Sequence, residues 1–400
     1  MLSKGRQFKN IMGNVGAYAS IIFTILVIIS IIYYCFSTGI NRISFDMLVN
    51  DYYETAYFAS VEKNDDTYYS FEEKEDVYFS SKWGIALKDD KDLEGIKCVK
   101  IYYIDSMSPF ANAKKENSRE SIVISNGMLV KRIQFKTEVG NEIVTVKNGS
   151  EQIIDKLNSA IKIDEFYFAS MGGGIRGSLL STIYLILLTL VISLPLGILV
   201  ALYLGNYAKD NKFIQILRTL IDMISGIPSI IFGLVGVIVF IPFVSVISNT
   251  SGLSILAGAF TMSIMILPLI IKNTEDAINA IPKSYKMNSL ALGASETQTT
   301  FKVILPNAIS GILTSTLLSI GRIIGESAAL IFVMGSAIQD NVNIFKGATT
   351  LSVHIWTVLA AENPNYSLAC SISIIILLVV FLLNILVKII CKRLNRFEVK

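Results

Sequence analysis

Two charged residues, Arg322 and Glu326, stand inside an apolar stretch near the end of the chain. A charged side chain at the centre of a bilayer costs about 2.5–3.5 kcal/mol on insertion scales, so it is rarely placed against lipid. The i, i+4 spacing of the pair predicts that both side chains lie on one helix face. We therefore expect the pair to face a bundle interior or a water-filled path. The alternative is a mutual salt bridge that only serves helix packing.

The chemistry of the pair favours an anionic substrate. The planar guanidinium of Arg322 can hold an oxyanion such as phosphate through two parallel hydrogen bonds, which a lysine cannot do. Glu326 would repel an anion, so we expect it to orient Arg322 or to neutralise it when the site is empty. The sequence thus predicts a substrate path at Arg322 and Glu326.

The chain lacks the residues of an enzyme centre. His354 is the only histidine, and it is expected to be a loop or helix-end residue. No phosphate-cradling Walker loop is present, so the chain is not an ATPase. No metal-ligand spacing and no disulfide framework is found among the cysteines Cys35, Cys98, Cys370 and Cys391. We predict no catalytic residue, no metal site and no bound cofactor.

The apolar residues are gathered into long runs. The chain is 52% hydrophobic and only 17% charged, whereas soluble domains are near a quarter charged. A helix rises about 1.5 Å per residue, so about 20 apolar residues cross a hydrocarbon core about 30 Å thick. We predict six membrane spans, at about 17–36, 178–204, 228–247, 253–271, 309–334 and 368–390.

The distribution of basic residues predicts the orientation of these spans, because short cytoplasmic loops are rich in Lys and Arg. The basic residues that flank the first, second, fourth and sixth spans are Lys4, Arg6, Lys9, Lys209, Lys212, Lys272, Lys283, Lys286, Lys302, Lys388, Lys392, Arg393, Arg396 and Lys400. Both termini are therefore expected in the cytoplasm. The first run lacks a small-residue cleavage site and is longer than a signal core, so it is expected to be an uncleaved anchor.

The segment 41–175 differs from the rest of the chain, with 17 basic and 23 acidic residues. Alternating apolar residues predict strands at 97–104 and 142–147, and a helix is expected at 151–161. Asn126-Gly127 tolerates the positive φ of a tight turn, so a hairpin is expected between 121–125 and 128–133. We predict a small α+β domain outside the membrane.

The polar segment between the fourth and fifth spans, about 272–308, is expected to form a helix–turn–helix on the cytoplasmic side. Gly293 suits the left-handed conformation that ends a helix. Ser295 and Gln298 have the spacing of a capping box that begins the next helix. Pro306 then marks the entry to the fifth span.

This segment resembles the coupling loop of type I ABC importer permeases, whose pattern is E-A-A-x3-G-x9-I-x-L-P. Gly293 and the run Val303-Ile304-Leu305-Pro306 match its second half, whereas Met287-Asn288-Ser289 replace Glu-Ala-Ala. In that family the loop docks into a cleft on a separate ATPase. The resemblance implies that the contact residues are Asn288, Ser289, Ala291, Gly293, Leu305 and Pro306.

Two further stretches resemble phosphate permeases of the PstA type. One is G-I-P-S-I-I-F-G-L at 226–234, in which Pro228 can open a helix and Gly233 allows close helix packing. Its motif residues are Gly226, Pro228, Ser229 and Gly233. The segment before it, 213–225, is expected along the inner surface, with Arg218 and Asp222 paired one turn apart.

The other stretch is Arg322-Ile323-Ile324-Gly325-Glu326, which is similar to the R-x-x-G-E of PstA-type chains. Gly325 is part of this motif, and Ser327-Ala328-Ala329 replace the T-A-P that follows it in the family. A weaker match, L-S-V-H-I-W at 351–356, favours the PstA type over its usual partner, the PstC type.

The resemblance implies an all-α polytopic membrane protein with six transmembrane helices and the type I ABC importer permease fold. The predicted organisation is a first span within 1–40, an inserted small α+β extracytoplasmic domain at 41–175, and a permease domain at 176–400. By resemblance, the chain lies in a bacterial plasma membrane and pairs with a second permease of the PstC type. It would also bind two ATPase subunits of the PstB type, which use ATP and Mg²⁺, and an external phosphate-binding protein of the PstS type. Membrane lipid is the other expected partner, and nucleic acid is not expected.

The predicted function is a permease subunit of an ATP-driven phosphate importer. Two alternatives remain at this point. The chain could carry another oxyanion such as sulfate or molybdate, or it could be a membrane-anchored receptor or regulator with 41–175 as its sensor. Neighbouring genes for an ATPase and a second permease would favour the importer.

Overall fold

The computed structural model describes residues 4–61, 67–72, 74–93, 95–115, 124–138, 140–208, 211–250 and 252–394. The chain divides into two compact units, a helical unit (Met1–Ile43 with Gly177–Lys400) and a β domain (Ser44–Arg176). Lys209, Arg396 and Lys400, three of the basic residues beside the predicted spans, lie outside the described residues.

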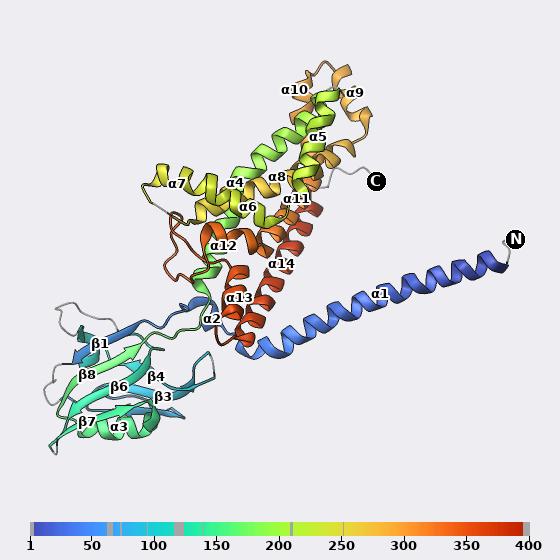
Figure 1. Cartoon of the computed structure of the whole chain (residues 1–400). Helices are drawn as coiled ribbons and strands as arrows, with labels where there is room; N and C mark the ends of the chain where they lie inside the picture. Colours follow the sequence, from blue (N-terminus) through green and yellow to red (C-terminus); the bar gives the residue numbers. More distant parts are fainter. Residues whose placement is uncertain are drawn as a thin grey trace. The chain divides into compact units, whose positions relative to one another are not determined.

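The helical unit is a bundle in which α11 packs on α8 and on α14, and α14 also packs on the end of α1 (Figure 1). Its elements are α1 (Lys4–Gly39), η1 (Ile40–Arg42), α4 (Arg176–Leu202), η4 (Tyr203–Tyr207), α5 (Lys212–Ser225), α6 (Ser229–Val235), η5 (Gly236–Phe240), α7 (Ile241–Ser248), α8 (Ile255–Asn279), α9 (Lys283–Ala291), α10 (Glu296–Thr299), η6 (Thr300–Ile304), α11 (Leu305–Gly325), α12 (Ala328–Met334), α13 (Leu351–Ala360) and α14 (Tyr366–Leu394).

Six helical segments of the described chain are long and apolar enough to cross a membrane, as the sequence predicted. They are Asn14–Arg42, Arg176–Tyr207, Ser229–Ser248, Ile255–Asn279, Glu296–Gly325 and Tyr366–Arg393. The second, third and fifth contain the π-helical turns η4, η5 and η6.

The fifth span differs from its predicted extent. It was expected to continue to Met334, but α11 ends at Gly325 and a separate helix, α12, begins at Ala328. Glu326 between them has extended backbone angles, with φ −79° and ψ 126°. The end of α11 cannot be recognised from hydrophobicity, because apolar residues occur on both sides of it.

The helix α5 lies against α8 and is held there by two ion pairs. Arg218 contacts Glu275 at 2.7 Å, and Asp222 contacts Lys272 at 3.0 Å. The expected pair of Arg218 with Asp222 is therefore wrong, since each has its partner on α8. These two ion pairs hold α5 against the half of α8 that the sequence predicts to lie on the cytoplasmic side.

The β domain is built on an antiparallel eight-stranded sheet of order β2-β3-β4-β6-β8-β1-β5, in which β7 also pairs with β6. Its elements are α2 (Phe45–Val49), β1 (Ala56–Val61), β2 (Val77–Ser80), β3 (Ile85–Lys91), β4 (Lys97–Ile104), η2 (Pro109–Asn112), β5 (Lys114–Lys115), β6 (Leu129–Lys136), β7 (Asn141–Thr145), η3 (Val146–Asn148), α3 (Gly149–Ser159) and β8 (Lys162–Ala169).

One face of this sheet is covered by α3, and the core lies between them (Figure 1). Ile153 and Leu157 of α3 are fully buried against strand residues that include Phe135 and Phe166. The α+β insertion is therefore present, but its sheet is much larger than the few strands expected from sequence. The chain as a whole combines a helical unit with a sizeable β domain.

The strand predicted at 97–104 coincides with β4, whereas the predicted hairpin is wrong in its pairing. Gly127 has the positive φ expected of the turn, at +89°. However, the described part of the first predicted strand, Ile124 and Ser125, is not a strand, and 121–123 lies outside the described residues. The strand β6 instead pairs with β7, which follows it in the chain, and with β4 and β8, which are further away in sequence.

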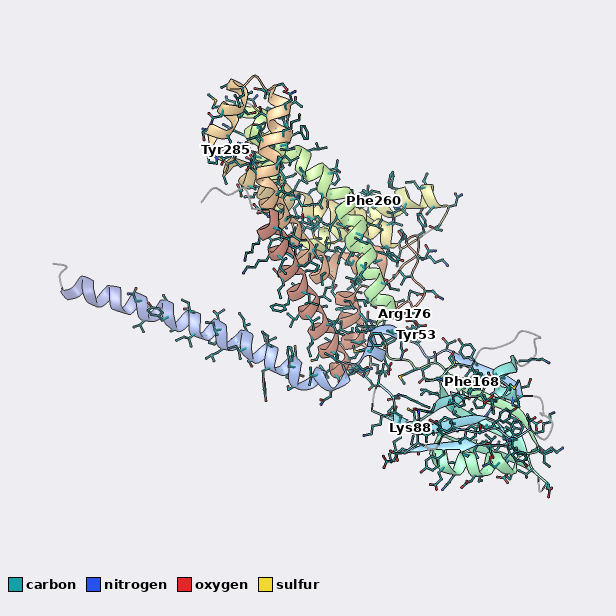
Figure 2. The ribbon with its side chains drawn as sticks, turned by 180° about the vertical axis from the view of Figure 1, so that it is seen from behind. Tyr53, Lys88, Phe168, Arg176, Phe260 and Tyr285 are labelled. Atoms are coloured by element: carbon teal, nitrogen blue, oxygen red, sulfur yellow. The ribbon has the colours of Figure 1, made fainter. Side chains whose placement is uncertain are left out.

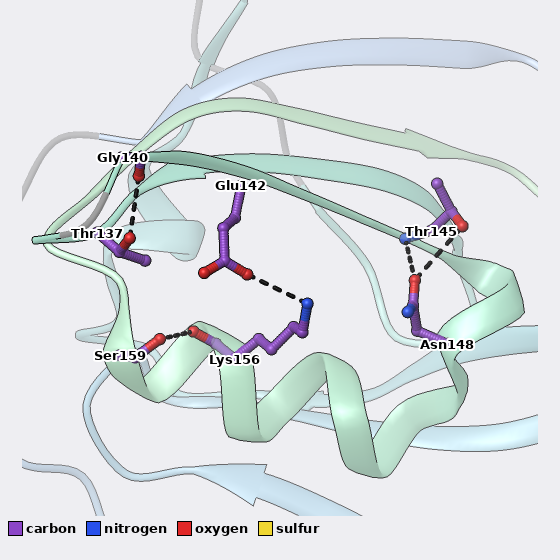
Figure 3. Close-up of polar contacts among 7 residues, drawn as sticks. All are labelled: Thr137, Gly140, Glu142, Thr145, Asn148, Lys156 and Ser159. Atoms are coloured by element: carbon purple, nitrogen blue, oxygen red, sulfur yellow. Dashed lines mark hydrogen bonds and ion pairs between the residues drawn. The ribbon is translucent and has the colours of Figure 1, made fainter.

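The junction from β7 to α3 is fixed by side-chain contacts (Figure 3). The side-chain oxygen of Asn148 accepts a hydrogen bond from the backbone N–H of Thr145 at 2.9 Å. Lys156 on α3 forms an ion pair with Glu142 on β7 at 3.1 Å. These contacts hold η3 in place between the strand and the helix.

Candidate functional site

Arg322 lies in the last turn of α11 and is exposed in the isolated chain. Asn307, Thr314, Leu318 and Gly325 are exposed on the same helix face, since they are separated from one another by whole turns. The opposite face of α11 carries the buried residues Ala308, Ile312, Ser315, Ser319 and Ile323. The outward face of α11 is therefore partly polar and ends at Arg322.

The guanidinium of Arg322 is available to a ligand. Among the described residues, it takes part in no hydrogen bond and no ion pair. Gly321 and Gly325 flank it, and a Cβ atom added at either glycine would meet nothing within 4 Å. No neighbouring side chain therefore obstructs the helix surface beside Arg322 in the part of the chain that the structure describes.

Glu326 does not share a helix face with Arg322, because it lies beyond the end of α11. Its carboxylate Oε1 accepts a hydrogen bond from the backbone N–H of Ala329, at 3.1 Å, in the first turn of α12. Its carbonyl oxygen accepts a hydrogen bond from the hydroxyl of Ser352 on α13, at 2.6 Å. The expectation of an i, i+4 pair on one helix is wrong, since Glu326 instead joins the break to α12 and α13.

The motif at 226–234 leads into α6 and allows that helix to pack against α12. Pro228 is the residue that caps α6, and Ser229 is its first residue. A Cβ atom at Gly233 would lie 2.9 Å from Cα of Ala329, so only glycine permits this approach. Gly226 ends α5 and has no such close neighbour. Gly233 thus allows α6 to contact the first turn of α12, just after the break at Glu326.

The segment 272–308 forms two short helices at one end of the helical unit, with Tyr285 of α9 near its tip (Figure 2). Gly293 has φ +86° and ends α9, and Ser295 and Gln298 form the predicted capping box of α10. The hydroxyl oxygens of Ser289 and Thr299 are 2.9 Å apart and join the two helices.

The tip of this segment is apolar and open. Leu292 is 90% exposed and Met287 is 65% exposed. Asn288, Ala291 and Gly293 are exposed beside them, and Leu305 and Pro306 lie in the first turn of α11. The ammonium of Lys286 binds the side-chain oxygen of Asn206 at 2.7 Å, which ties the tip back to η4. The arrangement is an anchored segment with an exposed apolar end.

His354 is not the loop or helix-end residue expected from the sequence. It lies within α13 and is fully buried. Its Nδ1 is 2.8 Å from the hydroxyl oxygen of Ser178, which is itself 3.0 Å from that of Thr349. Burial and, to a smaller extent, the charge of Arg42 lower the pKa of His354 to about 4. Neutral His354 therefore joins α13 to α4 and has no exposed nitrogen for catalysis.

Residues 193–397 match the family described as the binding-protein-dependent transport system inner membrane component. The chain belongs to this family. The family description is that of a membrane component of a transport system, not of an enzyme. The match covers α11 with Arg322, the break at Glu326 and the whole of the anchored segment.

Several curated proteins similar to this chain are named as phosphate transport permeases, and others as ABC transporter permeases. The phosphate transport system permease protein PstA of Haemophilus influenzae is 32% identical over 238 residues, which cover 58% of this chain and 82% of that protein. The probable ABC transporter permease protein YqgI of Bacillus subtilis is 37% identical over 200 residues, covering 47% of this chain and 66% of that protein. The predicted resemblance to PstA-type permeases is confirmed.

The chain covers less than two thirds of several other relatives, down to 29% of their length. Among solved structures, a chain of the MetNI methionine ABC transporter in an inward-facing conformation matches with a TM-score of 0.44 at 23% identity. That match covers 56% of this chain and 96% of the other.

Proposed function

We propose that the chain is the permease subunit of an ATP-driven importer of inorganic phosphate. The observation that carries this proposal is the free guanidinium of Arg322 on the partly polar, outward face of α11. Relatives named as phosphate transport permeases support phosphate as the substrate.

The outward face of α11 is expected to face a second permease subunit and not lipid. Arg322 is the only charged residue of α11, and its cost against hydrocarbon would not be offset by a partner within the described chain. Asn307 and Thr314 on the same face add hydroxyl and amide groups that water or an anion can contact. A path for the anion would then run between this face and the second permease, of the PstC type.

Arg322 would hold phosphate through its planar fork of N–H donors, which matches the spacing of phosphate oxygens. Glu326 is not placed to neutralise Arg322, since its carboxylate caps α12. Its role is to fix the break that leaves Arg322 at the end of α11. The substrate path at Arg322 is thus positioned by Glu326, which does not itself bind the anion.

The tip of the segment 272–308 would dock on the ATPase. Leu292 and Met287 provide an exposed apolar end of the kind that a protein cleft buries. Lys286 anchors this end to η4, so a movement of the ATPase would be transmitted to the spans. ATP and Mg²⁺ would be bound by that partner, of the PstB type.

We further propose that the protein lies in a bacterial plasma membrane with both termini in the cytoplasm. This orientation rests on the basic residues beside the first, second, fourth and sixth spans. The β domain then lies outside, on the side from which a phosphate-binding protein of the PstS type would deliver the anion.

The experiment that tests the substrate is ATP-dependent uptake by the whole complex in liposomes, with labelled phosphate, sulfate and molybdate in parallel. Phosphate uptake that the other two anions do not compete with would support the proposal. Uptake of sulfate or molybdate alone would replace the substrate and keep the transport function. Uptake of none of them would favour the receptor or regulator.

A further inference from the structure

The β domain contains a groove of about 740 Å³ between the end of the β3–β4 hairpin and the start of α3. Its walls are formed by residues on both strands and on η3. The charged residues among them are Asp89, Asp90, Lys91, Lys97 and Lys147. We refer to it as the lysine groove.

Two of the lysines are placed against each other by the register of the sheet. Lys91 on β3 lies directly opposite Lys97 on β4, and Lys88 lies opposite Lys100 three residue pairs further along the two strands. Like charges directly opposite on neighbouring strands destabilise the pairing. An anion lying between the ammonium groups of Lys91 and Lys97 would remove this repulsion.

The two carboxylates of the groove are already engaged. Asp89 accepts a hydrogen bond from the backbone N–H of Ser150 at 2.9 Å, in the first turn of α3. Asp90 forms an ion pair with Lys100 at 2.7 Å and accepts a hydrogen bond from the backbone N–H of Lys91 at 2.8 Å. Both aspartates therefore stabilise the walls of the groove.

The three lysines, by contrast, are exposed and form no ion pair with any part of the chain that the structure describes. Since Lys100 neutralises Asp90, the groove keeps three positive charges against the charge of Asp89 and that of Asp92, which lies in the β3–β4 turn near Cys98. The net charge of the groove is therefore positive, although the net charge of the surrounding β domain is negative.

One wall of the groove is held rigidly. Lys147 and Asn148 belong to η3, which the Thr145–Asn148 hydrogen bond and the Glu142–Lys156 ion pair fasten between β7 and α3 (Figure 3). Lys147 therefore projects from a fixed turn, while Lys91 and Lys97 project from paired strands. The backbone that carries the three lysines is therefore fixed before binding, and only their side chains lose conformational entropy when an anion binds.

We propose that the lysine groove binds a phosphate-bearing ligand, with its phosphoryl oxygens held by Lys91, Lys97 and Lys147. Lysine is a common phosphate ligand because its ammonium provides three donors on a flexible stem. The volume lies within the range of about 300–1,000 Å³ typical of small-molecule sites and exceeds the needs of one phosphate ion. A chain of phosphate groups therefore fits better than a single one.

Calorimetric titration of the full-length protein in detergent tests this proposal without the ATPase. The background is Arg322→Ala, so that the proposed transport path does not contribute to binding. The probes are inorganic phosphate and tripolyphosphate. We expect saturable binding of tripolyphosphate that is tighter than that of phosphate and weakens as salt is added.

The double variant Lys97→Gln, Lys147→Gln should weaken binding about a hundredfold, because each lost charged hydrogen bond is worth roughly a factor of ten. Lys136→Gln, an exposed lysine of β6 outside the groove, is the matched control and should bind as the parent does. Lys147→Gln alone disturbs no described side-chain contact, so it provides a second variant that should fold normally.

Saturable binding of inorganic phosphate alone would indicate free phosphate as the ligand, and tighter binding of tripolyphosphate would indicate a phosphate chain. Both results support the groove as a phosphate site. Failure of both probes to saturate, or binding that the groove variants leave unchanged, would overturn it. Neither negative result bears on transport through the path at Arg322.

Discussion

The carboxylate of Glu326 caps α12 through a 3.1 Å hydrogen bond from the backbone N–H of Ala329. This bond replaces the continuous helix that the apolar sequence predicts and leaves Arg322 at the end of α11. Ser352 of α13 holds the carbonyl of the same residue. Glu326 is therefore a positioning residue for Arg322. The effect of its hydrogen bond to Ala329 and the effect of its negative charge can be tested with different substitutions.

Glu326→Gln should keep phosphate uptake near that of the wild type, because an amide oxygen still accepts the Ala329 hydrogen bond. Glu326→Ala removes the cap, which is worth about 1 kcal/mol, and should lower both uptake and the melting temperature in detergent. Equal loss of uptake in both variants, with normal melting of Glu326→Gln, would mean that the charge itself acts on the path.

Gly325→Val should block uptake while the subunit still folds. A side chain at Gly325 meets nothing within 4 Å in this chain, so it would instead fill the space beside Arg322. The measurement is uptake by an assembled complex of normal melting temperature. Gly16→Val is the matched control, since Gly16 of α1 is equally open. Normal uptake by Gly325→Val would remove this face of α11 from the path.

Leu292→Asp should uncouple the permease from its ATPase. The side chain is 90% exposed, so the change leaves the fold intact, but a buried contact of this kind is worth about 2 kcal/mol or more at a protein interface. ATPase binding by the purified permease should weaken about thirtyfold. Asn279→Asp adds the same charge at the exposed end of α8 and serves as the control. Unchanged ATPase binding by Leu292→Asp would exclude this tip as the docking site.

Cys98 in the β domain should react slowly with alkylating reagents at neutral pH. Burial raises the pKa of its thiol to about 11, and the reactive form is the thiolate. At pH 8 about one thiol in a thousand is ionised, so the rate should rise about tenfold per pH unit up to about pH 11. The measurement uses a chain whose other three cysteines are replaced by serine. A rate that levels off near pH 8.5 would show an ordinary, exposed thiol.

Much of the helical unit could be predicted from the sequence, because a span requires a long apolar run and such runs are visible without tertiary information. The break at Glu326 could not be predicted, since apolar residues continue on both sides and the contacts that hold the break, to Ala329 and Ser352, are tertiary or side-chain hydrogen bonds. The buried position of His354 depends on Ser178, which is 176 residues away in the chain.

For the candidate site, the cost of a charge in hydrocarbon was enough to single out Arg322. The role of Glu326 could not be predicted in this way, because the cost of burial in hydrocarbon is similar for every charged side chain. In the β domain, alternation identified β4, yet the lysine groove depends on a register that places Lys91 opposite Lys97. Strand register between distant segments is not encoded in any local pattern.

The central claim is that the fork of Arg322 contacts phosphate on the transport path. The most direct measurement is the phosphate concentration dependence of ATP-driven uptake for wild type, Arg322→Lys and Arg322→Gln, with Leu26→Ala, an exposed position of α1, as control. We expect Arg322→Lys to raise KM about tenfold, since it keeps the charge and loses the paired donors. Arg322→Gln should abolish uptake, and Leu26→Ala should leave it unchanged. Wild-type KM and maximal rate in both arginine variants would contradict the account.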